Sequence, residues 1–237
     1  MRPIFVTGTD TGVGKTVVTC AVAAFCALHK GLDVGVMKPF EAGLTLRGGN
    51  FIPGDATALK EASGSLDDLS LINPYFFESP LAPQIASELE HVHVDLELLD
   101  RIYGQLKASH QILFIEGAGG VLVPIAKNFF YIDLMKRWDV QALVVARLGL
   151  GTINHTLLTC ACLRQAAIPV AGIILNDGEG TKNLATKTNP DMLARYVDVP
   201  ILGIFPHVES NPRDFPDSPL LAELVDKNID TGPLFLI

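Results

Sequence analysis

The sequence predicts a doubly wound α/β fold of the P-loop NTPase type, with a mostly parallel sheet and helices on both faces. Short runs rich in Val, Ile and Leu alternate with longer helical patterns along the chain. Such runs, without polar alternation, are typical of strands buried on both faces, and helices between them imply parallel crossovers. A glycine-rich loop between the first run and the first helix is the third observation, because phosphate-binding loops occupy this position.

The apolar runs place the strands and the first helix. The expected strands are 4–7, 33–37, 112–115, 142–146, 170–175 and 201–205, and the expected first helix is 15–30. Residues 44–85 carry frequent Gly and Pro, so we expect a less regular excursion over the active face. The apolar tail 231–237 is expected to pack onto the body or onto a partner subunit. Because no Ser-, Gly- or Pro-rich linker divides the chain, we expect one domain over residues 1–237.

Charge and composition exclude several classes of protein. The chain has 18 Lys and Arg against 26 Asp and Glu, a net charge of −8, whereas nucleic-acid binding usually requires a basic surplus. With 49% apolar and 19% charged residues, the composition is that of a compact globular protein. The first apolar run is too short for a signal peptide, and no stretch approaches about 18 apolar residues. We therefore expect no nucleic-acid partner, no membrane association and a cytoplasmic location.

Cysteines and histidines form no recognisable metal or redox motif. Four cysteines lie in helical patterns without zinc or redox spacing, and we interpret them as small apolar core residues: Cys20, Cys26, Cys160 and Cys162. His91 and His93 are closely spaced but lack an accompanying third ligand, so we expect both to be exposed.

The strongest motif is the loop from Gly8 to Thr16, which follows a predicted strand and opens a helix. Its glycines allow backbone N–H groups to curl around phosphate oxygens, Lys15 reaches the outer phosphates, and the Thr16 hydroxyl ligates Mg²⁺. The usual pattern requires glycine at the position of Thr9, and the nearest glycine is Gly8. We predict a nucleotide site containing Gly12, Val13, Gly14, Lys15, Thr16 and Val17.

Charged residues that follow other strands suit the same site. Lys38 comes directly after the strand 33–37 and before Pro39, where a second cation can meet phosphate or substrate. Glu116 follows the strand 112–115 and precedes small residues, and an acid in this position holds Mg²⁺ in phosphate-loop enzymes. Asp55 is either a further oxygen ligand or a turn or helix-cap residue.

Two segments have both a binding and a purely structural interpretation. Residues Gly151 to Asn154 open a helix after the strand 142–146, so their free N–H groups suit a carboxylate, although ordinary capping also explains them. Asn176 and Asp177 follow the strand 170–175. The amide can pair with a donor and an acceptor on a base edge, but a simple turn is an equally good explanation.

Together these motifs resemble the dethiobiotin synthase family. The resemblance runs from residue 4 to about residue 212 and rests on the loop 7–16, Lys38-Pro39 with Gly43, Asp55, Asn73-Pro74-Tyr75, the segment 116–120 with Pro124, Ile153-Asn154-His155 and Asn176-Asp177. The phosphate loop is widely shared, whereas the whole set is specific. The resemblance implies a homodimeric, ATP- and Mg²⁺-dependent ligase of biotin synthesis, whose substrates are 7,8-diaminononanoate and CO₂ or bicarbonate.

The resemblance also implies a reaction and a role for each matching position. In that family CO₂ forms a carbamate on one amine, and the carbamate oxygen attacks the γ-phosphate of ATP to give a carbamic-phosphoric anhydride. The second amine then closes the ring by displacing phosphate. Lys15 and Lys38 would contact phosphates and reacting groups, and Thr16, Asp55 and Glu116 would hold Mg²⁺. The carboxylate of a substrate molecule bound at the neighbouring subunit would be received by four residues: Gly151, Thr152, Ile153 and Asn154. The nucleotide would meet Gly117, Ala118, Gly119, Pro206, His207, Val208 and Asn211, with its adenine at Asn176 and Asp177.

One substrate position departs from the family pattern. Ala42 stands where the family usually has Ser or Thr, which removes a substrate hydrogen bond worth about 1 kcal/mol. The alternatives are a P-loop switch ATPase and an inactive nucleotide-binding regulator. Switch ATPases carry a lysine at the position of Asp10, so this residue and the acidic charge argue against them. Ala42 leaves the regulator open.

Overall fold

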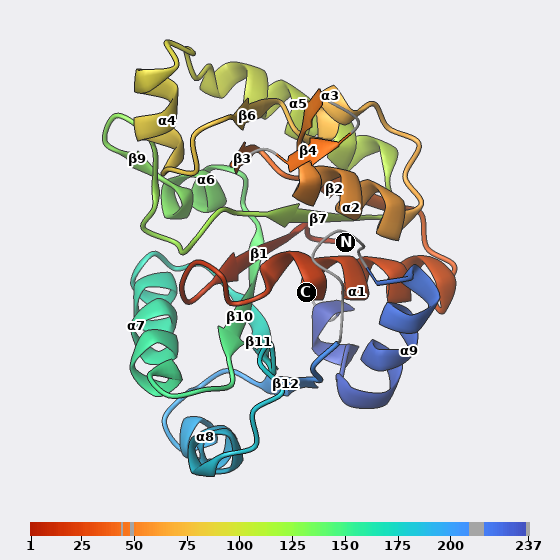
Figure 1. Cartoon of the computed structure of the whole chain (residues 1–237), viewed down its shortest axis with the longest axis vertical. Coiled ribbons are helices and arrows are strands. Elements are labelled where there is room, and N and C mark those ends of the chain that lie inside the picture. Colours follow the sequence, from red (N-terminus) through yellow and green to blue (C-terminus); the bar gives the residue numbers. More distant parts are fainter. Residues whose placement is uncertain (44, 48–49, 209–215, 236–237) are drawn as a thin grey trace.

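The computed structural model describes residues 1–43, 45–47, 50–208 and 216–235. Its centre is a parallel six-stranded sheet in the order β12-β11-β10-β1-β7-β2 (Figure 1). The strands are β1 (Ile4–Gly8), β2 (Val34–Met37), β7 (Ile112–Glu116), β10 (Gln141–Arg147), β11 (Val170–Asn176) and β12 (Ile201–Phe205). Each predicted strand is present, with ends that differ by no more than one residue, and the predicted fold class is confirmed.

Helices cover both faces of this sheet. The helices are α1 (Lys15–Leu28), α2 (Gly54–Ser63), α3 (Leu69–Ile72), α4 (Pro83–Leu89), α5 (Leu96–Ser109), α6 (Tyr131–Arg137), α7 (Thr152–Gln165), α8 (Leu184–Ala194) and α9 (Ser218–Asn228). Apolar residues of α1, α2 and α9 form one core with the sheet, and those of α5, α6, α7 and α8 form the other (Figure 1). The predicted first helix ends two residues early, at Leu28.

The predicted irregular excursion contains regular structure. Besides α2, α3 and α4, it holds the antiparallel pair β4 (Thr45–Arg47) and β5 (Asn50–Ile52), and β6 (Tyr75–Phe77), which pairs in parallel with β3 (Phe40–Ala42). A further antiparallel pair, β8 (Pro124–Ala126) and β9 (Phe129–Phe130), follows the 116–120 segment. Two of these Gly and Pro residues mark the ends of a helix: Pro53 is the N-cap of α2, and Gly64 ends it with φ of 69°.

The sequence predicts that the C-terminal tail packs onto the body or onto a partner subunit and that the cysteines lie in the core. A 3₁₀ turn, Gly232–Phe235, buries Leu234, whose carbonyl accepts a hydrogen bond from Gln141 Nε2 at 3.2 Å. Residues 232–235 of the tail therefore pack onto the body. Cys20, Cys26 and Cys160 are buried free thiols and Cys162 is half-buried, while His91 and His93 are exposed. No helix in the described part of the chain has the length and apolar character to span a membrane.

Candidate active site

The loop between β1 and α1 has the backbone conformation of a phosphate-binding loop. Gly12 and Gly14 have φ of 71° and 86°, in the left-handed region that favours glycine. Gly14 is the N-cap of α1 and supplies no side chain, so the first N–H groups of the helix are available to an anion. A Cβ on Gly8 would lie 2.7 Å from the carbonyl of Asp10 and 3.0 Å from Lys15 Nζ. This crowding explains why the glycine stands at position 8 in this loop.

Three side chains predicted from separate parts of the sequence meet beside this loop. Lys38, directly after β2, places Nζ 2.5 Å from Glu116 Oε1 and 2.8 Å from Asp55 Oδ2. Glu116 is the last residue of β7, the neighbour of β2 in the sheet, which is why the two meet at its carboxyl edge. The same Glu116 oxygen accepts a hydrogen bond from Thr16 Oγ1 at 2.9 Å.

The charges of this cluster depend on one another. Burial alone would lower the pKa of Lys38, but its ion pairs with Glu116 and Asp55 outweigh burial and raise that pKa above the ordinary value. Burial likewise opposes ionisation of Asp55, and pairing with Lys38 prevails and lowers the pKa. Among the described residues no carboxylate forms an ion pair with Lys15, and burial prevails over the more distant acids and lowers the pKa of Lys15 to about 8.

The residues here fit a magnesium ion. Glu116 is fully buried, and its Oε2 has no hydrogen-bond partner in the described part of the chain. An orphaned carboxylate oxygen at this depth is costly unless a cation or a donor reaches it. Together with the Thr16 hydroxyl and Asp55, it forms the all-oxygen donor set that Mg²⁺ prefers.

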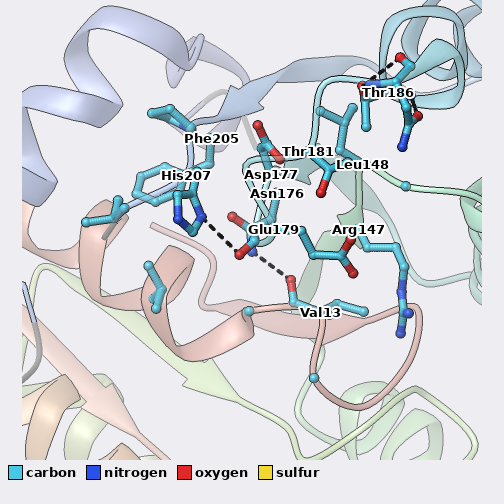
Figure 2. Close-up of a pocket in the computed structure, with 18 of the residues that line it drawn as sticks. Val13, Arg147, Leu148, Asn176, Asp177, Glu179, Thr181, Thr186, Phe205 and His207 are labelled. Atoms are coloured by element: carbon cyan, nitrogen blue, oxygen red, sulfur yellow. Dashed lines mark hydrogen bonds between the residues drawn. The ribbon is translucent and has the colours of Figure 1, made fainter. Parts of the chain in front are cut away.

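Two cavities flank the loop. The phosphate-side cavity has a volume of about 570 Å³ and is lined by Thr11, Gly12, Gly14, Lys15, Thr16, Val17, Lys38, Glu41, Ala42, Asp55, Pro80, Leu81, Ala82, Pro83, Ala118, Gly119 and Val123. The base-side cavity has about 510 Å³ and is lined by Gly12, Val13, Gly14, Val17, the segments 147–150, 176–179 and 205–208, Thr181, Asn183, Thr186 and Pro216 (Figure 2). Gly12, Gly14 and Val17 line both, so the loop is a shared wall.

Hydrogen bonds hold the base-side cavity together (Figure 2). Asn176 Nδ2 donates to the carbonyl of Val13 at 2.9 Å, which connects the end of β11 to the phosphate loop. Asp177 Oδ1 accepts from the backbone N–H of Gly180 at 3.0 Å. His207 Nδ1 lies 3.0 Å from the carbonyl of Gly178. The cavity wall is therefore built from strand ends that the predicted parallel sheet brings to one edge.

A family model and curated relatives both match most of this chain. A family model described as an AAA domain matches residues 2–212. A protein from Thermodesulfovibrio yellowstonii, named ATP-dependent dethiobiotin synthetase, is 41% identical over 97% of either chain. The chain belongs to the ATP-dependent dethiobiotin synthetase family. A Bacillus subtilis protein with the same name is 38% identical over 87% of either chain.

Solved structures outside the synthetase family share only the fold. A MinC–MinD cell division complex from Aquifex aeolicus has a TM-score of 0.54 at 17% identity and covers 88% of this chain and 82% of that chain. A ParA family ATPase from Chlorobium tepidum has a TM-score of 0.52 at 15% identity, with full coverage of both chains. These likenesses agree with the predicted P-loop NTPase architecture.

Some residues expected from the synthetase resemblance lie outside the cavity linings. Glu116 is fully buried and does not line the phosphate-side cavity, and Gly117 is covered by the Phe5 ring, 2.9 Å from where a Cβ would stand. The segment from Gly151 to Asn154 lines neither cavity; its two end residues are exposed, and Thr152 is buried. Asn211 lies outside the described residues.

The sequence prediction missed residues that hold the synthetase site in place. Glu41, in the wall of the phosphate-side cavity, accepts hydrogen bonds from backbone N–H groups at the start of α2. Burial, then the nearby Asp55, raises its pKa to about 6. Asn73 donates to the carbonyl of Lys38 at 2.6 Å, and Asn189 donates to the carbonyls of Leu148 and Gly149 at 3.1 and 2.8 Å. The one sequence feature that could have indicated Glu41 is its place three residues after Lys38. Asn73 belongs to the Asn73-Pro74-Tyr75 motif of the family resemblance, but no role of its own was assigned to it from the sequence.

Proposed function

We propose that this chain catalyses the ATP- and Mg²⁺-dependent ring-closing carboxylation of 7,8-diaminononanoate with CO₂, which yields dethiobiotin. The observation that carries this proposal is the cluster of Lys38, Glu116, Asp55 and Thr16 beside the phosphate loop, in which Lys38 and Glu116 are buried. It borders a cavity of about 570 Å³, a size suited to a small organic substrate. Membership of the dethiobiotin synthetase family supports the same reaction.

The side chains of this cluster have two roles, charge neutralisation and metal binding. Lys15 and Lys38 neutralise negative charge on the phosphates and on the substrate carbamate, because both ammonium groups border the phosphate-side cavity. Backbone N–H groups at the start of α1 add further positive potential. Thr16, Asp55 and Glu116 would hold Mg²⁺, which supplies charge stabilisation to the transferred phosphoryl group. Ring closure within one bound molecule needs no protein nucleophile, only correct placement of the two amines.

The nucleoside is assigned to the base-side cavity. Asn176 and Asp177 lie at the end of β11 and Pro206 to Val208 at the end of β12, so these residues surround one cavity. Asn176 Nδ2 is engaged with the loop, which leaves its carbonyl oxygen to accept from the amino group of adenine. Gly12 to Val17 would hold the phosphates between the two cavities.

The substrate carboxylate is assigned to a second subunit. Gly151 to Asn154 open α7 with Gly151 at φ of 90° and no side-chain cap, so the helix has free N–H groups for a carboxylate. Because this segment lines neither cavity of its own subunit, a homodimer would bring it to the site of a neighbour. We propose further that residues 1–237 act as one catalytic domain and that the enzyme works in the cytoplasm.

The decisive experiment follows ADP and dethiobiotin together. Purified protein is incubated with ATP, Mg²⁺ and bicarbonate, with and without 7,8-diaminononanoate, and dethiobiotin is measured by mass. ADP release that depends on the diamine and matches dethiobiotin supports the ligase and makes Ala42 a tolerated variation. Hydrolysis independent of the diamine would favour a switch ATPase, and nucleotide binding without turnover would favour an inactive regulator.

A further inference from the structure

Helix α2 begins without a capping side chain of its own. Pro53 occupies the N-cap position and gives no side-chain hydrogen bond to the first turn. The carboxylate of Glu41, on β3, takes this place from outside the helix. Its Oε1 accepts from the N–H of Asp55 and its Oε2 from the N–H of Ala56, each at 2.9 Å. A carboxylate at this position also interacts favourably with the positive end of the helix.

The backbone held in this way is that of Asp55. While its N–H donates to Glu41, its side-chain Oδ2 lies 2.8 Å from Lys38 Nζ. Lys38 and Glu41 belong to one short segment that runs from β2 into β3. This segment therefore fixes Asp55 twice, once through the backbone and once through the side chain.

Glu41 is not placed to be a ligand itself. It is only 5% exposed, and each of its oxygens already accepts a backbone hydrogen bond. Glu116 differs, because its Oε2 is buried and has no partner in the described residues. The hydrogen bonds therefore distinguish a carboxylate with one oxygen left unused from a carboxylate whose two oxygens both hold the backbone of a neighbouring helix.

We propose that Glu41 is a positioning residue for the magnesium-bound nucleotide. Its carboxylate fixes the first turn of α2 and so holds the Asp55 carboxylate beside Lys38 and Glu116. Groups that orient a metal ligand typically change metal affinity by about tenfold to a hundredfold when removed. The identity of the ligand, Mg²⁺ with ATP, rests on the proposed function.

The test compares Glu41→Ala and Glu41→Gln with the wild type. Binding of a fluorescent non-hydrolysable ATP analogue is titrated with Mg²⁺ and, separately, measured in EDTA. We expect Glu41→Ala to raise the half-saturating Mg²⁺ concentration about tenfold. Glu41→Gln keeps one carbonyl acceptor and should raise it less. Binding in EDTA should stay within about twofold of the wild type, because the phosphate loop is untouched.

Glu61→Gln is the matched control, since Glu61 is an exposed acid on the same helix. It should leave the Mg²⁺ dependence unchanged. An unchanged Mg²⁺ dependence in the Glu41 variants, or an equal loss of binding with and without Mg²⁺, would overturn the proposal and leave Glu41 a structural cap. If Glu41→Ala does not fold, Glu41→Gln decides by the same criteria. None of these binding measurements needs the diamine. If the wild type forms no dethiobiotin, that result contradicts the proposed function and leaves the test of Glu41 unaffected.

Discussion

Asn176 Nδ2 donates a hydrogen bond to the carbonyl of Val13 at 2.9 Å, which connects the end of β11 to the phosphate loop. Asn176 and Gly14 are packed closely, because a Cβ on Gly14 would lie 2.0 Å from the same amide nitrogen. A side chain at position 14 would therefore displace Asn176. Asn176 is also a wall of the base-side cavity. The residue assigned to the adenine is thus also a support for the loop assigned to the phosphates.

Asn176→Ala should weaken binding of the ATP analogue about tenfold, since it removes the donor to a buried carbonyl and one contact to the base. Titration of the analogue measures this directly. Asn228→Ala is the control, because that residue is exposed on α9 and its amide donates to the carbonyl of Leu224 in the same helix. Unchanged affinity in Asn176→Ala would remove the residue from both roles.

Lys38→Ala should lower dethiobiotin formation by at least about a hundredfold, because it removes a fixed cation from the reacting groups. It also leaves Glu116 buried and without its ion pair, so the melting temperature should fall. Mg²⁺ should then stabilise the variant more than the wild type, since the metal restores a positive charge beside Glu116. Thermal melts with and without Mg²⁺ test this.

Lys227→Ala provides the control for Lys38, because Lys227 is exposed on α9 and, within the described ranges, forms an ion pair with Glu223 alone. A Lys38→Ala variant with an unchanged rate would exclude this lysine from the mechanism.

Lys15 should make nucleotide binding depend on pH above neutrality. Its pKa is about 8 in the ligand-free protein, lowered mainly by burial. Phosphate favours the charged form, so the complex holds more protons and affinity falls as pH rises through 8. Calorimetry at pH 8 in two buffers of different ionisation enthalpy should detect proton uptake on binding. Lys15→Met should abolish that uptake; an equal uptake in the variant would assign the proton elsewhere.

His110 should make stability depend on pH at a point away from the active site. Its Nδ1 lies 2.9 Å from Asp33 Oδ1 and its Nε2 lies 2.8 Å from Asp67 Oδ2. Burial opposes the charged imidazolium, but the two carboxylates prevail and raise the pKa above 6.5. The stabilisation is therefore fully present below pH 6.5 and is lost as pH rises through the raised value.

Melting temperatures at pH 6 and pH 8.5 test the His110 contact. His110→Gln should destabilise the protein more at pH 6 than at pH 8.5. His93→Gln, which alters an exposed histidine, should show no such difference. Equal destabilisation by His110→Gln at both pH values would contradict an ionic role.

The sheet was predictable because its signal is local. Buried parallel strands are apolar runs, and the run from Val170 to Leu175 needs no knowledge of the rest of the chain. The meeting of Lys38 and Glu116 was also predictable, since both follow strands and strand ends share one edge. These predictions depend on periodicity and on one topological rule.

Glu41 was not predictable in the same way. Its partners are backbone N–H groups, and backbone groups carry no sequence signature. The helix that Glu41 caps was not predicted either, because Pro53 and Gly54 were interpreted as punctuation of an irregular stretch. Asn189 is a similar case: its contacts to Leu148 and Gly149 connect residues about forty positions apart. Contacts between a side chain and a distant backbone require the three-dimensional arrangement.

The wall shared by the two cavities has a consequence for inhibitors. Gly12, Gly14 and Val17 border both, so a compound confined to one cavity leaves the other cavity unused. Under the proposed function, a tethered compound that joins a nucleoside to a diamine would follow the path assigned to the triphosphate over this loop. Its selectivity over other P-loop proteins would come from the Pro80 to Pro83 side, because the loop itself is common to the whole superfamily.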